Sequence, residues 1–424
     1  LVVLAPRATA ETAVLRADWP QWRGPAQTGC VAAGVPMPSA LPAEPKVVWR
    51  AKIGDGYASP VVAKGSVFYL DNQGGNETVH AAEAATGKEL WSATLDACFK
   101  DNFVSGPRCT PLADADRVYA QSCRGEFQCL SMADGKVIWK KNFTTDFGAV
   151  FIGEKGAATG ASRHGNAGPP VIDGDNIIVG VGGTKGACLV CMKKATGDVV
   201  WQSQNDQTAY GPVLLTTLCG VKQAIAFTVE GLIGVDPAKG SLLWRSPPMK
   251  TAFGRHITTP VVADDTVLVA SHTLGLIATR IAKDAKDGAA TAETAVLRAE
   301  TAWTEKAMGI NFSSPVLVGQ HLYGLGPAKN IVCIDVRTGK LAWDKKGCVM
   351  TDPGKAHAAF IVMDKNILML TDAGQLILFA ADPKEYKEIG RAQVCGQTWC
   401  NPAYVDGRLY LRDAKELLCV ELLK

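Results

Sequence analysis

The sequence predicts an all-β fold, an eight-bladed β-propeller with four antiparallel strands in each blade. Three observations lead to this prediction: a tryptophan that recurs every 40 to 62 residues, a proline-marked strand start ahead of it, and 43 glycines in 424 residues. Short strands at a period of about 40 to 50 residues are typical of propellers, in which each repeat forms one blade. One large all-β domain therefore explains the length of the chain.

The recurring tryptophan ends a six-residue motif, of which Thr86-Gly87-Lys88-Glu89-Leu90-Trp91 is one of the clearest copies. The glycine suits a tight turn between the third and fourth strands, because such a turn needs a positive φ. The indole then offers a wide, flat surface to the neighbouring blade. We therefore assign the motif a structural role. The tryptophans in this position are Trp49, Trp91, Trp139, Trp201, Trp244, Trp303 and Trp343.

A small residue followed by proline marks the start of the first strand in most blades. These pairs are Ser59-Pro60, Thr110-Pro111, Pro169-Pro170, Gly211-Pro212, Thr259-Pro260 and Ser314-Pro315. Degenerate copies at 358–360 and 401–402 bring the count to eight. The last blade ends after three strands, so we expect residues 47–50 to supply its fourth strand. Closing the ring in this way removes the open sheet edges.

The first 45 residues precede the repeats. Residues 1–10 are predicted to be the remnant of a secretory signal, because a short apolar stretch is followed by Ala8-Thr9-Ala10, a cleavage-site pattern. Residues 11–45 are expected to form an N-terminal extension, and residues 46–424 the propeller. This interpretation places the protein outside the cytoplasm, in the periplasm or the extracellular space. The string ATAETAVLRA occurs at 8–17 and again at 290–299, and no physical reason for the repetition emerges.

Composition limits the partners. The chain has 44 basic and 41 acidic residues, a formal net charge of +3, which argues against a nucleic-acid partner. No apolar run approaches the ~18 residues of a membrane-spanning helix, so no transmembrane segment is expected. The motifs of P-loop enzymes, zinc proteases and serine hydrolases are missing. The remaining partners are a protein or an anionic small molecule.

The chain contains thirteen cysteines. In an exported protein the pairs Cys98 with Cys109, Cys123 with Cys129, and Cys395 with Cys400 are disulfide candidates, because each pair is close in sequence. Cys188 and Cys191 lie on an expected strand, where positions i and i+3 face opposite sides, so a shared disulfide or metal is not expected there. The alternative is that most of the cysteines are small buried apolar residues. No metal site is predicted.

The residues just before each inner strand are expected to meet at one mouth of the central channel. They form a basic and aromatic set, and such side chains suit anionic and planar ligands. The alternative is that each residue only satisfies the loop of its own blade. We expect the arginines to attract an anion, and His256 and His357 to gain charge near pH ~6 and strengthen binding. The ligand-binding candidates are Tyr57, Arg108, Arg163, His164, Tyr210, Arg255, His256, Phe312, His357 and Trp399.

Over residues 46–424 the repeats resemble the tryptophan-docking motif of the quinoprotein-like propellers, the proteins with pyrroloquinoline-quinone (PQQ)-like repeats. The opening Trp19-Pro20-Gln21-Trp22-Arg23-Gly24-Pro25 is similar to the start of exported proteins of this type whose role is uncharacterised. The superfamily contains PQQ-dependent alcohol dehydrogenases and the non-catalytic lipoprotein of the outer-membrane barrel-assembly machinery. The resemblance therefore implies the fold and leaves the function open.

The resemblance also implies what an enzyme of this superfamily needs: calcium held by Glu and Asn or Asp, a catalytic Asp and a disulfide between adjacent cysteines. This sequence has no adjacent cysteine pair, and the segments that lead into its inner strands are poor in carboxylates. Calcium takes six to eight oxygen ligands. We therefore expect an exported, non-catalytic binding or scaffold protein without catalytic residues and without a cofactor. The alternative is a PQQ- and calcium-dependent alcohol or sugar oxidoreductase.

Overall fold

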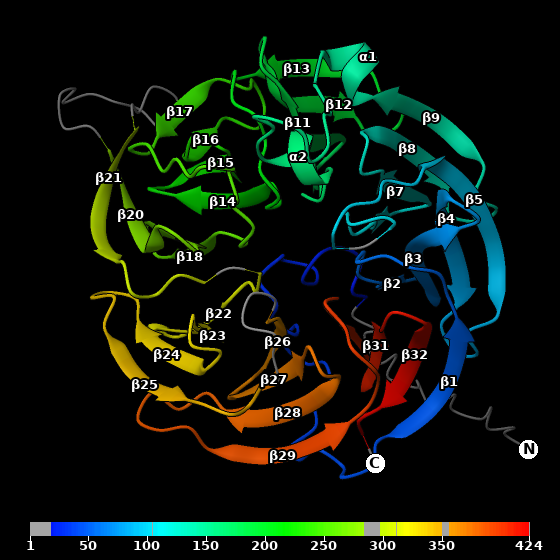
Figure 1. The fold of residues 1–424 in the computed structure, drawn as a ribbon, viewed down its shortest axis with the longest axis vertical. Helices are drawn as coiled ribbons and strands as arrows, with labels where there is room; N and C mark the ends of the chain where they lie inside the picture. The colour runs from blue at the N-terminus through cyan, green and yellow to red at the C-terminus, as the bar shows by residue number, and fades with distance from the viewer. Residues whose placement is uncertain (1–17, 104, 284–296, 311, 350–355, 424) are drawn as a thin grey trace, which may run out of the picture.

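The computed structural model describes residues 18–103, 105–283, 297–310, 312–349 and 356–423. Its strands form eight sheets arranged in a ring around a central channel (Figure 1). Each sheet has four strands, and paired strands are antiparallel. This is the eight-bladed propeller that the repeats predicted. The signal remnant proposed at 1–10, the first copy of the repeated string and residues 290–296 of the second copy lie outside the described residues.

Each blade runs from an inner strand at the channel to an outer strand at the rim. Blades 1 to 4 consist of β2 (Val61–Ala63), β3 (Ser66–Gln73), β4 (Asn76–Glu83) and β5 (Glu89–Ala97); β6 (Leu112–Asp114), β7 (Arg117–Gln121), β8 (Glu126–Ser131) and β9 (Val137–Asn142); β10 (Val171–Asp173), β11 (Asn176–Gly183), β12 (Ala187–Lys193) and β13 (Val199–Ser203); and β14 (Leu214–Leu218), β15 (Val221–Phe227), β16 (Leu232–Val235) and β17 (Leu242–Arg245). Blades 5 to 8 consist of β18 (Val261–Ala263), β19 (Thr266–Ser271), β20 (Gly275–Lys283) and β21 (Leu297–Glu305); β22 (Val316–Val318), β23 (His321–Leu325), β24 (Ile331–Asp335) and β25 (Leu341–Lys345); β26 (Ala358–Met363), β27 (Asn366–Thr371), β28 (Gln375–Ala380) and β29 (Glu388–Gln393); and β30 (Ala403–Val405), β31 (Arg408–Arg412), β32 (Glu416–Glu421) and β1 (Lys46–Lys52).

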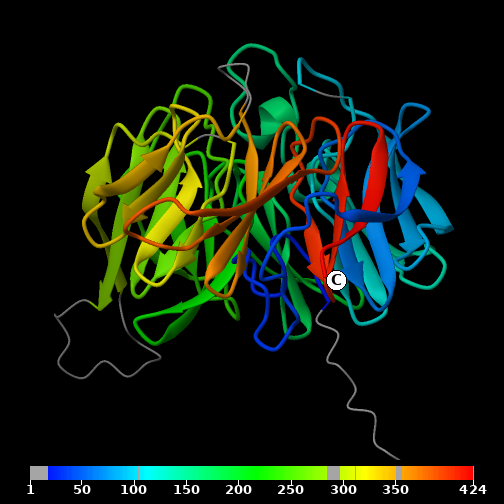
Figure 2. The same cartoon turned by 90° about the horizontal axis from the view of Figure 1, so that it is seen from below.

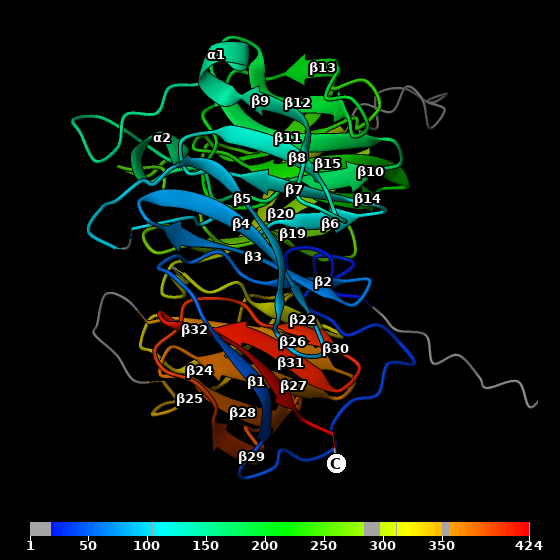
Figure 3. The same cartoon turned by 90° about the vertical axis from the view of Figure 1, so that its right-hand side faces the viewer.

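The ring closes with a strand from the other end of the chain. β1 pairs antiparallel with β32, with Lys46 opposite Glu421 and Lys52 opposite Glu416. Figure 3 shows β1 running beside β32 on the side of the ring. The expected closure of the last blade by residues 47–50 is therefore confirmed. As a result the last blade has its full four strands, and each blade has a neighbour on both sides.

The motif tryptophans hold neighbouring blades together. Trp49 of blade 8 lies against Gly87 of blade 1, and its indole nitrogen donates to the carbonyl of Ala84 at 3.0 Å. The same contact, with the acceptor three residues ahead of the glycine, recurs for Trp91, Trp139, Trp201 and Trp303. Glycine is required at these turns because a Cβ atom on Gly87, where φ is +73°, would lie 2.5 Å from the indole of Trp49.

Two tryptophans depart from this pattern because the blade they face lacks the glycine turn. Trp343 donates to the carbonyl of Asp382 at 2.9 Å, where blade 7 has a proline-containing loop. Trp244 bonds to the Gln223 side chain of its own blade, and faces blade 5, which has no copy of the motif. Packing between blades therefore tolerates loss of the turn, provided that the indole nitrogen finds another acceptor.

The segment of residues 18–36, which we call the plug, fills the end of the channel below the inner strands. Figure 2 shows it on the face opposite α2. Its hydrogen bonds reach every blade except blade 3, and they join Trp19 to Val62, Pro20 to Ala113, Gln27 to Val213, Trp22 to Thr259, Arg23 to Pro315, Val31 to Val362 and Pro36 to Tyr404. The plug thereby ties blades together that are far apart in the sequence.

Two short helices lie between blades 2 and 3. The α1 helix (Phe143–Phe147) is capped by Asn142, whose side chain accepts from the amides of Thr144 and Thr145. The α2 helix (Ala161–His164) brings His164 to the channel, and it is followed by Gly165. Among the described residues no helix is long and apolar enough to cross a membrane.

The cysteine prediction is wrong in this structure, because all thirteen cysteines are free thiols. The thiols of the proposed pair Cys123 and Cys129 point to different neighbours: the first contacts the carbonyl of Gly106, and the second that of Lys194 in the next blade. The thiols of Cys395 and Cys400 likewise face the carbonyls of Gly396 and Tyr57.

The thiols of the third proposed pair, Cys98 and Cys109, are also free. Ten of the thirteen cysteines are buried. This burial agrees with the alternative that cysteine serves here as a small apolar residue.

Candidate functional site

The residues ahead of the inner strands meet around one cavity of about 170 Å³ at the channel mouth. Because the plug occupies the other end of the channel, the cavity is a funnel, with Trp22 of the plug in its lining. Two of the ten sequence candidates, Arg163 and His256, lie outside this lining. The eight candidates in the lining are Tyr57, Arg108, His164, Tyr210, Arg255, Phe312, His357 and Trp399.

Aromatic rings form one wall of the funnel. Tyr57 stacks on Trp399 with ring centroids 5.2 Å apart, and Phe312 packs on Trp399 at 5.0 Å. Phe103 joins them, with its centroid 6.3 Å from those of both Phe312 and Trp399. The Tyr57 hydroxyl donates to the carbonyl of Phe103 at 3.2 Å, so its polar end is already satisfied. The wall therefore presents flat apolar faces, which suit a planar ligand.

Arg108 lines the funnel, but its charge is compensated. Its guanidinium donates to Asp101 Oδ1 at 2.6 Å and to the carbonyl of His164. The side chain of Asp101 is only 1% exposed. Burial alone would raise the pKa of Asp101, but hydrogen bonds from His164 and Arg108 outweigh burial and hold that pKa well below its usual range. The expectation that Arg108 attracts the ligand is therefore corrected, because its charge is neutralised by the buried carboxylate of Asp101.

The other two arginines share one aromatic ring. The guanidinium of Arg163 lies 4.5 Å from the centroid of Phe253, and that of Arg255 lies 5.6 Å from it. Neither arginine has a carboxylate partner among the described residues. The charges of both arginines and of Arg108 lie close enough to the half-buried Tyr210 to oppose the rise in its pKa that burial causes, which places all three at the same end of the channel. Of these two arginines, Arg255 lines the funnel, whereas Arg163 packs on Phe253 outside the lining.

Two histidines differ from their expected roles. His256 is fully buried and stacks on Phe227 with centroids 4.1 Å apart, so it belongs to the core and not to the mouth. His357 does line the funnel, but it is only 4% exposed. Burial lowers the pKa of each histidine to about 4. The expectation that they gain charge near pH ~6 and strengthen binding is therefore wrong.

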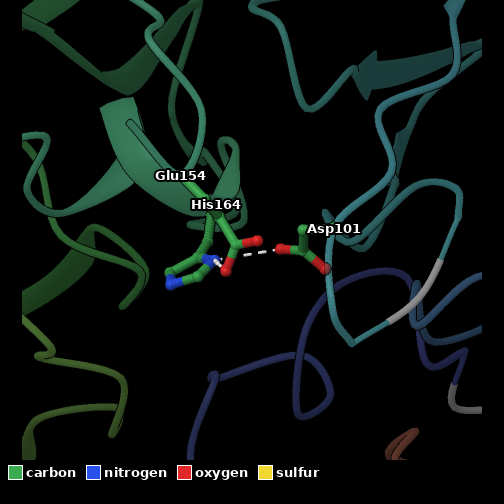
Figure 4. Close-up of side chains that lie close together, drawn as sticks. All are labelled: Asp101, Glu154 and His164. Atoms are coloured by element: carbon green, nitrogen blue, oxygen red, sulfur yellow. Dashed lines mark hydrogen bonds and ion pairs between the residues drawn. The ribbon is translucent and has the colours of Figure 1, made fainter. Parts of the chain in front are cut away.

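His164 lies in a cluster with two carboxylates (Figure 4). Its Nδ1 is 2.9 Å from Asp101 Oδ2 and 3.6 Å from Glu154 Oε1. These residue types also bind metals, but Asp101 already holds the guanidinium of Arg108. A metal ion at this point would meet a like charge in a buried setting, which opposes its binding. The cluster is best described as a hydrogen-bonded network centred on Asp101.

Comparison with known proteins identifies the family. Residues 40–158 and 124–382 match the family described as outer membrane protein assembly factor BamB. Together these two stretches span most of the chain. The chain belongs to the BamB family. No curated protein matches it.

Solved structures agree with the fold of this BamB-family propeller. BamB from Moraxella catarrhalis is similar, with a TM-score of 0.57 and 15% identity over 89% of this chain and 98% of that one. Quinohemoprotein alcohol dehydrogenase ADHIIG from Pseudomonas putida HK5 gives 0.62 and 10% over 96% and 80%. The quinohemoprotein alcohol dehydrogenase from Comamonas testosteroni gives 0.51 and 15% over 97% and 81%. At such identities these similarities show the fold alone.

A calcium-bound quinone does not fit the funnel of this BamB-family chain. None of the described residues that line the funnel is an aspartate or a glutamate. The nearby carboxylate of Asp101 is occupied by Arg108 and His164. Calcium requires six to eight oxygen ligands, with carboxylates among them, and the lining does not offer that set. A planar carboxylic acid that binds without a metal ion does not need these oxygen ligands.

Sequence reasoning missed four residues that shape the funnel of this BamB-family member. Phe103 and Asp101 come from the loop between β5 and β6, whose composition gave no sign that it folds over the mouth. Trp22 stood out only through the resemblance of its motif. Phe253 was open to prediction, since it lies two residues before Arg255 in a segment already singled out.

Proposed function

We propose that this BamB-family propeller is an exported, non-catalytic binding protein whose funnel takes a planar, anionic small molecule. One observation carries the proposal. Arg255 lines the same cavity as the aromatic wall and has no acidic partner among the described residues. The family description, which refers to the outer membrane, supports an exported location.

Two physical effects favour an anion in the funnel. A guanidinium in a concave, partly dehydrated cavity interacts more strongly with an anion than the same charge on an open surface does. The contact of Arg163 and Arg255 with Phe253 positions both cations without neutralising them, because a ring supplies only its quadrupole. A carboxylate that reaches Arg255 also gains a planar, two-point hydrogen bond.

The chemistry of the lining favours binding over catalysis. Tyr57 and Tyr210 donate their hydroxyls to the backbone carbonyls of Phe103 and Gly160. Burial keeps His357 neutral, as its lowered pKa shows. The described lining therefore lacks a nucleophile beside a base, which acyl or phosphoryl transfer requires.

The test is a binding measurement with probes of matched shape. We expect 2-naphthoate to quench tryptophan fluorescence or release heat in calorimetry, and the neutral isostere 2-naphthamide to bind more weakly. Arg255→Met should weaken 2-naphthoate about tenfold, the usual loss for one charged hydrogen bond, and leave 2-naphthamide unchanged. Arg337→Met is the matched control, because Arg337 is exposed at the rim and pairs with Asp335. An affinity for 2-naphthoate that Arg255→Met leaves intact would overturn the proposal.

A protein partner is a second candidate function, favoured by the outer strands. Several of these strands expose an apolar side chain immediately ahead of the docked tryptophan, and the family description names protein assembly. These side chains are those of Leu90, Val137, Ile138, Val199, Val200, Leu242 and Leu341. A photo-crosslinking residue at Val200 should give a discrete protein adduct in cells, and one at exposed Lys222 should not. Equal labelling at both positions would speak against a partner on this strip.

A further inference from the structure

The contact between Asp101 and His164 fixes the position of one hydrogen atom. Nδ1 of His164 lies 2.9 Å from Asp101 Oδ2 and also faces Glu154. An ionised carboxylate only accepts hydrogen bonds, so Nδ1 must carry a hydrogen. Asp101 is ionised, because the hydrogen bonds from His164 and Arg108 outweigh its burial and hold its pKa well below the usual range. In the neutral tautomer that this contact selects, Nε2 is a hydrogen-bond acceptor.

That acceptor has no partner. Nε2 of His164 is buried and makes no hydrogen bond in the structure. Figure 4 shows this nitrogen on the side of the ring that points away from both carboxylates. The residue is 7% exposed and lines the funnel. Buried polar atoms in proteins are nearly always paired, so an unpaired one on a residue that lines a cavity is a group that a bound ligand could satisfy.

The surroundings hold the imidazole in place. Arg108 donates to the carbonyl of His164, and Phe103 packs edge-on against the ring, with centroids 5.4 Å apart and planes at 87°. His357, the other histidine of the lining, stacks on Trp399, and none of its contacts with the described residues fixes a tautomer. A polar group held in one orientation by its neighbours discriminates between ligands better than a mobile one does.

We propose that His164 determines the specificity of the funnel: Nε2 accepts a hydrogen bond from a hydroxyl of the ligand, and the ligand is a hydroxylated aromatic carboxylate. This inference rests on the proposed binding of planar anions. The carboxylate pairs with Arg255, the ring lies on the wall of Tyr57, Trp399 and Phe312, and the hydroxyl donates to His164. A site built to accept from a hydroxyl discriminates strongly against the analogue without one.

The experiment compares 2-naphthoate with its ring-hydroxylated isomers and with their methyl ethers by calorimetry. We expect at least one hydroxy isomer to bind the parent protein about tenfold more tightly than 2-naphthoate, as expected for pairing an unsatisfied buried group. The corresponding methyl ether should lose that gain, because it keeps the oxygen and has no hydrogen to donate. This comparison uses only the parent protein and does not depend on the folding of a variant.

Variants then assign the effect to one atom. His164→Phe should abolish the preference for the hydroxy isomer over 2-naphthoate, whereas His321→Phe, the matched control on β23 outside the funnel lining, should keep that preference. Equal affinities for 2-naphthoate and all its hydroxy isomers, or a preference that survives in His164→Phe, would overturn this inference and leave the proposed function standing. Failure of every naphthoate to bind would overturn both.

Discussion

Arg108 and Asp101 form an ion pair of 2.6 Å in which the carboxylate is 1% exposed and the guanidinium 10%. This pair divides the three arginines around the funnel into two kinds. Arg108 is committed to the protein itself, whereas Arg163 and Arg255 face an aromatic ring and have no carboxylate partner among the described residues. We therefore expect replacement of Arg108 to lower the stability of the fold, and replacement of Arg255 to weaken ligand binding without lowering that stability.

Replacing Arg108 by methionine should destabilise the fold by about 3 to 5 kcal/mol, because it leaves a buried carboxylate without its partner. Replacing Arg255 by methionine should change the free energy of unfolding by no more than about 0.5 kcal/mol, since no ion pair is lost. Urea unfolding followed by tryptophan fluorescence measures both. If Arg108→Met unfolds at the same urea concentration as the parent, the structural role given to Arg108 is wrong.

Glu77 should make the protein less stable as pH rises from about 5 to 7. Glu77 is fully buried on β4, and burial raises its pKa to about 7, although the amide of Cys123 donates to it at 3.0 Å. The pKa of an unfolded glutamate is about 4.3, so between these values the folded state holds a proton that the unfolded state has released. Stability therefore falls with rising pH in this window, by about 3 kcal/mol at most.

The Glu77→Gln variant isolates this effect. It carries no charge, so the part of the pH dependence that belongs to Glu77 should disappear from melting curves recorded between pH 5 and pH 8. Glu83→Gln is the matched control, because Glu83 lies on the same strand and is exposed. The prediction fails if Glu77→Gln and the parent lose stability in parallel over this range.

Gly87→Ala should destabilise the fold more than Gly65→Ala. Both glycines have a positive φ, of +73° and +78°, so a side chain costs about 1 to 2 kcal/mol at either position. At Gly87 the new Cβ would also lie 2.5 Å from the ring of Trp49, whereas at Gly65 nothing lies within 4 Å. We expect a further loss of about 1 to 3 kcal/mol at Gly87 from displacing the indole. Equal melting temperatures would mean that the tryptophan contact adds nothing to the closure of the ring.

Incubation with PQQ and calcium should give no alcohol-dependent dye reduction. The described lining has no carboxylate with which to hold calcium. An authentic quinoprotein alcohol dehydrogenase serves as the positive control in the same assay. Sustained turnover would restore the oxidoreductase alternative.

The fold was predictable because its determinants are local and repeated. A glycine turn followed by a tryptophan sets both the φ of one residue and the contact with the next blade, and it occurs often enough for the blades to be counted. The same logic found the closing strand at Trp49, which lacks a glycine turn of its own but occupies the position of the motif tryptophan.

The funnel was predictable only in part, because it depends on contacts between distant residues. Asp101 lies 63 positions from the histidine it orients, and nothing near it in the sequence marks that partner. Arg255 and His256 are adjacent, yet one side chain faces the funnel and the other the core, which the composition of an irregular segment does not reveal. The cysteine pairs failed for the same reason, since proximity in sequence says little about where two thiols point.

The plug occupies one end of the channel, so a ligand enters the funnel from the other end. A ligand must leave by the route it entered, through the mouth opposite the plug, which we call the funnel rim. Anything that covers this rim, whether an antibody or a protein partner, would therefore slow capture and escape by the same factor. The dissociation constant of the ligand would then stay unchanged while its residence time lengthened. A protein bound over the funnel rim would therefore control how long the ligand stays bound and not its affinity.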